Sequence, residues 1–144
     1  MKTAWEGKIS SVRKHSLAEA AGICAGESLC AINNTPLRDI LDVSFAAADY
    51  DPVLSVRGVD GSLREVPVAK EIDEDLGLSF ESAVFDKVRL CHNRCVFCFV
   101  DRMIPGLRKG LYVRDDDYRL SFLYGNFVTL TNLSEEDFTR IIQN

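Results

Sequence analysis

The segment CHNRCVFC, residues 91–98, holds three of the five cysteines of the chain. Cys91, Cys95 and Cys98 are separated by three and then two residues, and thiolates at such short spacings can converge on one metal centre. Because five is an odd number, the cysteines cannot all pair as disulfides. Residues 1–15 also lack the apolar segment of a secretory signal. We therefore expect a reduced, cytoplasmic protein. Its clustered thiols bind metal, do redox chemistry or stand together by coincidence.

The nature of the metal depends on the fourth ligand. His92 is the nearest candidate, but it directly follows Cys91, and adjacent side chains rarely point at one ion. The sequence has no second cysteine pair at a distance, so a structural zinc site is the weaker alternative. Three cysteines with an open fourth position suit an iron-sulfur cluster better, since an open position distinguishes catalytic metal sites from structural ones.

Charge is distributed unevenly along the chain, whose net charge is −5. Residues 1–86 carry 8 basic and 15 acidic side chains, whereas residues 87–144 carry 9 and 7. Within the latter, residues 87–114 carry seven basic side chains and only Asp101 as an acid. The cysteines therefore lie in a basic segment, which would attract anionic ligands and does not exclude nucleic acid; a solvated arginine-rich loop explains the pattern equally well. The run Asp115–Asp117 is expected to be a solvated turn. No apolar run is long enough for a membrane span.

Short elements separated by turns must position these residues. The sequence predicts strands over residues 7–13, 28–37, 53–59 and 63–69, and helices over residues 16–22 and 38–49. Ser16 is expected to cap the first helix, with Glu19 three residues later. Cys24 and Cys30 are expected to be small core residues, and His15 to be exposed.

The first half of the chain resembles a circularly permuted PDZ domain of the bacterial type. The resemblance covers about residues 5–82 and rests on three motifs: Ala21-Gly22-Ile23, Gly26-Glu27 and Ile32-Asn33-Asn34. It implies a partly open β-barrel with two helices over residues 1–82. Leu76, Gly77 and Leu78 would form the loop that binds the terminal carboxylate of a peptide or protein added as a strand.

The acidic run Asp73–Asp75 precedes this loop and would repel a carboxylate. We therefore favour a packing or positioning role for the module, and a peptide-binding module remains the alternative function.

The cysteine motif, with Phe97 before its last cysteine, resembles the cluster motif of radical SAM enzymes. Residues 98–133 resemble one branch in particular, a family of iron-sulfur oxidoreductases that places a PDZ domain before a radical-SAM-like core. The resemblance implies that Cys91, Cys95 and Cys98 ligate a 4Fe-4S cluster. The cluster would bind S-adenosylmethionine and cleave it reductively to a radical that acts on an unknown substrate. Gly125 and Asn126 stand where the family holds the amino group of that cofactor, but without the usual acid.

The expected fold class is thus mixed, α+β or α/β. Residues 83–144 would form the opening of an incomplete radical-SAM (β/α) barrel: a strand at 88–91, the cluster loop 91–98, a strand at 121–131 and a capped helix at 134–142. We expect the chain to be the N-terminal part of a longer protein and inactive alone. An exposed edge at residues 121–130 would favour self-association.

Overall fold

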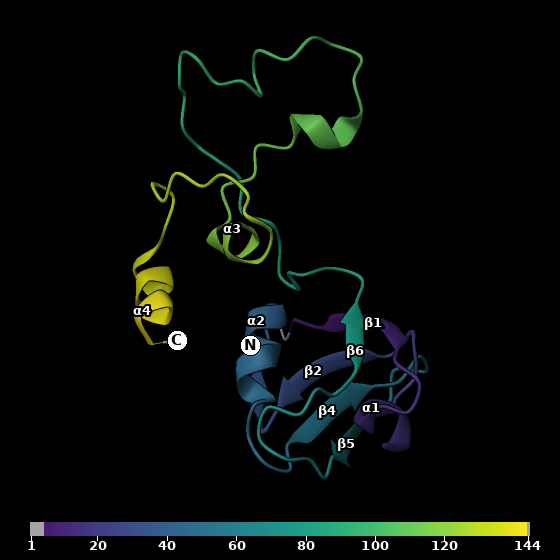
Figure 1. The fold of residues 1–144 in the computed structure, drawn as a ribbon. Helices are drawn as coiled ribbons and strands as arrows, with labels where there is room; N and C mark the ends of the chain where they lie inside the picture. The colour runs from purple at the N-terminus through teal and green to yellow at the C-terminus, as the bar shows by residue number, and fades with distance from the viewer. Residues whose placement is uncertain (1–4, 144) are drawn as a thin grey trace. The chain divides into compact units, whose positions relative to one another are not determined.

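A computed structural model describes residues 5–143, and the chain divides into two compact units after Lys87 (Figure 1). The first unit contains β1 (Gly7–Val12), α1 (Leu17–Ala20), β2 (Ser28–Ile32), β3 (Thr35–Pro36), α2 (Ile40–Ala46), β4 (Val53–Arg57), β5 (Leu63–Pro67) and β6 (Leu78–Phe80). The second contains the 3₁₀ helix η1 (Lys109–Tyr112) and the helices α3 (Tyr118–Tyr124) and α4 (Glu135–Gln143).

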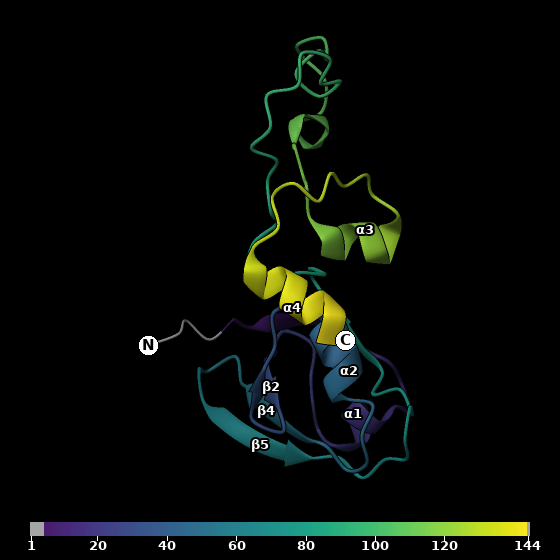
Figure 2. The same ribbon diagram turned by 90° about the vertical axis from the view of Figure 1, so that its left-hand side faces the viewer.

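The first unit is built on an open antiparallel sheet with the strand order β5-β4-β2-β1-β6, and β3 pairs with β2 (Figures 1 and 2). Asn33 and Asn34 both have positive φ, as the turn between β2 and β3 requires. Four antiparallel strands and both helices lie where the sequence predicts them, and this arrangement is consistent with a PDZ-like open sheet.

The apolar core of the described residues lies in this unit. Alternation along β4 turns Leu54 and Val56 inward, where they meet Ile9 of β1. The two helices each contribute one buried apolar residue, Ala18 and Val43. Packing of the helices on one face of the sheet therefore buries the apolar positions that the sequence pattern marks.

Side-chain caps fix where the helices begin. Ser16 accepts the amide of Glu19 at the start of α1, as predicted. Asp39 is fully buried and accepts two amides at the start of α2. In the second unit, Ser134 and Asp137 exchange reciprocal hydrogen bonds at the start of α4, which confirms the predicted capped helix.

One predicted core cysteine is exposed. Cys30 is buried, as expected, but Cys24 is exposed. The carboxylate of Glu27 accepts the amide of Cys24 and pairs with the guanidinium of Arg64. These contacts hold the turn so that Ile23 takes the inward position. The prediction that Cys24 is a core residue was therefore wrong, because its neighbour Ile23 occupies the core position instead.

The second unit has helices where strands were predicted. Residues 121–131 begin inside α3, which Asp117 caps at its start and Gly125 ends with a left-handed conformation. The N-cap aspartate and the terminal glycine enclose the seven residues of this helix and are local signals for helix formation. They outweigh the apolar alternation that predicted a strand. At residues 88–91 only the single bridge between Leu90 and Asp115 forms. Both strand predictions were wrong, and the edge proposed for self-association at 121–130 is not a strand.

A search of residues 5–143 finds no helix long and apolar enough to cross a membrane.

The first unit yields a test of backbone conformation. Gly77 has a φ of +80°, and a Cβ there would lie 2.3 Å from the Cβ of Ser16. Gly61 has a φ of +86°, but a Cβ there would meet nothing within 4 Å. We expect Gly61→Ala to cost about 1 kcal/mol from backbone strain alone, and Gly77→Ala to cost about 2–4 kcal/mol because a clash is added. Urea unfolding of both variants measures the difference, and equal losses would contradict it.

Candidate functional site

The three clustered cysteines lie on a wide loop between residues 91 and 114 that carries η1 (Figure 1). Cys91 stands at the base of the loop, where its amide donates to the carbonyl of Arg114 at 2.7 Å. Further along, the amide of Cys98 donates to the carbonyl of Cys95 at 3.1 Å. Cys91 and Cys98 are half-buried, Cys95 is exposed, and all three are free thiols.

These thiols are suitable metal ligands in type and accessibility. Across residues 5–143, however, no three histidine, cysteine or acidic side chains are gathered closely enough to hold a metal ion. Cys30 lies outside this group in the first unit, where burial raises the pKa of its thiol and leaves it protonated and inert. The donor set therefore fits an iron-sulfur cluster in chemistry, and the loop would have to bring the sulfurs together.

The two residues after Cys91 are anchored by side chains from a later segment. The His92 amide donates to Asn132 Oδ1 at 3.3 Å, and Asn93 Nδ2 donates to the hydroxyl of Thr131 at 2.7 Å. The guanidinium of Arg114 in turn donates to the carbonyl of Asn93. The beginning of the cluster loop is therefore fixed, while Cys95 is exposed beyond it.

The predicted solvated turn at Asp115–Asp117 is mostly buried. Asp116 is 4% exposed and Asp117 is 1% exposed. Asp116 accepts the amide and the hydroxyl of Thr129, both at 2.7 Å, and the side-chain amide of Asn132. Burial raises the pKa of Asp116, but these hydrogen bonds outweigh it and leave the pKa below its ordinary value. The prediction was wrong because residues distant in the sequence supply hydrogen-bond donors for these carboxylates.

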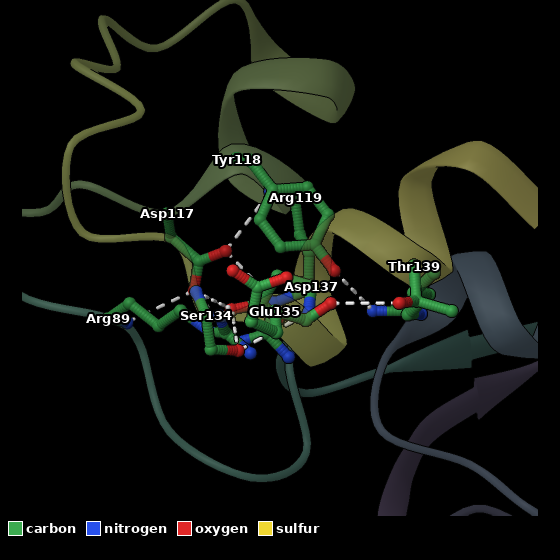
Figure 3. A network of polar contacts seen from close by, with 9 residues as sticks. Arg89, Asp117, Tyr118, Arg119, Ser134, Glu135, Asp137 and Thr139 are labelled. Atoms are coloured by element: carbon green, nitrogen blue, oxygen red, sulfur yellow. Dashed lines mark hydrogen bonds and ion pairs between the residues drawn. The ribbon is translucent and has the colours of Figure 1, made fainter.

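Beside this turn, oppositely charged side chains form a partly buried network (Figure 3). Arg119 is fully buried and pairs with Asp117 at 2.7 Å. Asp137 pairs with Arg89 and also accepts both donors of Ser134. The Arg89 guanidinium lies 5.5 Å from the centre of the Tyr118 ring, a cation–π contact. The network joins Arg89, two residues before the cysteine motif, to α3 and α4.

Gly125 and Asn126, the candidate cofactor residues, follow α3. Gly125 ends the helix with a φ of +71°, and Asn126 donates to Asp115 at 3.0 Å. Sequence reasoning missed the polar residues that anchor the loop. Three of them stand close together in an otherwise apolar stretch, which was the available signal: Thr129, Thr131 and Asn132.

The candidate peptide site lies at the end of the sheet in the first unit. Leu76 is buried, Gly77 forms the bend, and Leu78 begins β6. β6 pairs with β1 and is the last strand in the order, so its outer edge has no strand partner among residues 5–143. The Gly77 amide already donates to Asp75 Oδ1 at 2.9 Å, and Asp75 pairs with Arg13. The chain thus supplies its own carboxylate to the amide that a peptide would need.

Two family models match the chain. A radical SAM-like domain matches residues 70–144 and a PDZ domain matches residues 8–53. The first covers 75 of 144 residues, slightly more than half, so the chain belongs to the family of proteins with a radical SAM-like domain. The predicted combination of the two domains is confirmed. No curated protein gives a significant match.

Acid should weaken the second unit through Asp137. Burial alone would raise the pKa of Asp137, but Arg89 and Ser134 lower it from 3.8 to about 2. A pKa lowered by folding means that the stabilisation is complete above about pH 4 and is lost as the pH falls toward 2. We expect Asp137→Asn to lose roughly 2 kcal/mol at neutral pH and to show a flatter pH dependence in that window.

Urea unfolding at pH 7, 4 and 2 measures both effects. Glu135→Gln is the matched control, because Glu135 is exposed in the first turn of the same helix. An Asp137→Asn variant as pH-sensitive as the wild type would contradict the role of this carboxylate.

Proposed function

We propose that the chain is an iron-sulfur protein of the radical SAM type, with Cys91, Cys95 and Cys98 as ligands of a 4Fe-4S cluster. The observation that carries this proposal is three free thiols at CxxxCxxC spacing on an accessible loop of a radical SAM-like domain. When bound, such a cluster supplies an open iron for S-adenosylmethionine and the electron that cleaves it. Membership of the family supports the cofactor pair.

The chain's own residues have supporting roles in this proposal. Cys91 is fixed at the base of the loop, and Cys95 and Cys98 lie on its accessible part. Because the three sulfurs do not lie close enough together to hold a metal, the loop must close around the cluster when it binds. Gly125 and Asn126 are proposed to contact the cofactor, with residues 83–144 as the beginning of a radical-SAM barrel that follows a PDZ-like domain over residues 1–82. We place the protein in the cytoplasm, where its thiols stay reduced.

Anaerobic reconstitution with iron and sulfide tests the ligand set. The wild-type chain should become brown and contain iron and sulfide, and Ala at Cys91, Cys95 or Cys98 should abolish the cluster. Cys24→Ala and Cys30→Ala are the controls: both should retain it, with Cys30→Ala costing about 1 kcal/mol in packing. A colourless chain that binds one zinc ion would favour the structural zinc site. A requirement for Cys24 would overturn the assignment of ligands.

For the PDZ unit we propose a positioning role without capture of free carboxylates. The outer edge of β6 favours strand addition, but Asp75 holds the Gly77 amide and adds negative charge beside it. The terminal carboxylate of a peptide would therefore find the Gly77 amide already bonded to Asp75 and would be repelled by the negative charge of that side chain.

Fluorescence anisotropy with a library of labelled C-terminal peptides tests this role. We expect no saturable binding to the wild-type chain, and weak binding to Asp75→Ala, in which the Gly77 amide is released. Asp73→Ala is the matched control, because it removes the same charge without releasing that amide. Saturable wild-type binding that disappears when the peptide terminus is amidated would establish the peptide receptor instead.

A further inference from the structure

Asp116 stands at the centre of the polar contacts around the first cysteine. Its Oδ1 accepts the amide of Thr129, and its Oδ2 accepts the hydroxyl of Thr129 and the side-chain amide of Asn132. The carboxylate is almost fully buried, and none of these three hydrogen bonds involves Cys91 itself. Its effect on the cysteine must therefore pass through the residues that it binds.

Asn132 carries this effect to the backbone after Cys91. A carboxylate can only accept hydrogen bonds, so Asp116 fixes the NH₂ group of Asn132 toward itself. The amide oxygen at the other end of the same side chain then faces the His92 amide, from which it accepts at 3.3 Å. Without Asp116, the side chain of Asn132 could turn either end toward His92, and only one of them accepts.

Thr129 forms a second connection of the same kind. Its hydroxyl donates to Asp116 Oδ2 and accepts from Asn93 Nδ2 at 3.4 Å, and Asn93 also donates to Thr131. Because the Thr129 hydroxyl donates its hydrogen to Asp116, the hydroxyl oxygen can accept the hydrogen bond from Asn93. Both residues that follow Cys91 are thus bound to groups whose orientation the buried carboxylate determines.

We propose that Asp116 is a positioning residue that holds Cys91 in place through Asn132 and Thr129. This inference rests on the proposed cluster ligation, since the geometry of Cys91 matters most if its sulfur is a ligand. In the apo protein the same contacts should already restrain the segment 91–93, so the proposal can be judged with no cluster present. Groups that orient metal ligands commonly affect metal retention as well.

The test uses the full chain with Asp116→Asn and Asn132→Ala. Asp116→Asn keeps the shape of the side chain, but its NH₂ group must face at least one of the three groups that donate to Asp116: the amide and hydroxyl of Thr129 and the side-chain amide of Asn132. Asn132 is only half-buried, so its variant should fold even if the first does not. Asp115→Asn is the matched control, because it makes the same change one residue away, where the side chain accepts from Asn126.

Two measurements on the apo protein follow the segment directly: amide hydrogen exchange at His92, and alkylation of each cysteine by iodoacetamide followed by mass spectrometry. We expect both variants to speed His92 exchange and Cys91 alkylation about fivefold, the factor for one lost hydrogen bond. Exchange in α4 and alkylation of Cys95 should not change, whereas a general loss of structure would alter the exchange in α4. In reconstituted protein, iron should pass to a chelator faster from both variants than from Asp115→Asn.

Unchanged exchange and alkylation at residues 91–92 in both variants would overturn the positioning role. A wild-type chain that takes up no cluster would instead refute the proposed function, while the apo measurements would still decide the role of Asp116.

Discussion

The buried ion pair between Asp117 and Arg119 is the interaction on which the second unit depends. Both side chains are inaccessible to solvent, and the guanidinium lies 2.7 Å from the carboxylate. Asp117 also accepts the amide of Arg119 at the start of α3 and the amide of Arg89 before the cysteine motif. One carboxylate thus joins a helix to the segment that enters the cluster loop. Removing one partner of such a pair would leave a buried charge without compensation, which commonly costs several kcal/mol.

The two units are stabilised by different means. The first has an apolar core beneath an antiparallel sheet. Among residues 88–143, the buried side chains are all charged: Asp116, Asp117, Arg119, Asp137 and Arg140. Large apolar side chains there are mostly exposed, including Phe97, Phe122 and Phe127. Hydrogen-bonded ion pairs are directional, whereas apolar contacts are not, so the network can fix the ends of a loop whose own residues pack against little.

The domain matches and the structural units do not divide the chain at the same place. The radical SAM-like match begins at residue 70, but residues 78–80 form β6, the edge strand of the sheet in the first unit. Only residues 81–90 separate this strand from Cys91. The strand that completes the PDZ-like sheet and the segment that enters the cysteine motif are therefore nearly continuous in the chain.

The sequence by itself determined the elements of the first unit and the chemistry of the candidate site. Alternation and a capping serine are local signals, and the strands β1, β2, β4 and β5 formed where the alternation predicted them. The cysteine spacing likewise needs no tertiary information. Only the tertiary structure decided the roles of the acids at 115–117 and the exposure of Cys24. A carboxylate is buried only where donors from distant segments meet it, and Thr129, Asn132 and Arg89 reach Asp116 and Asp117 through folding, not through spacing.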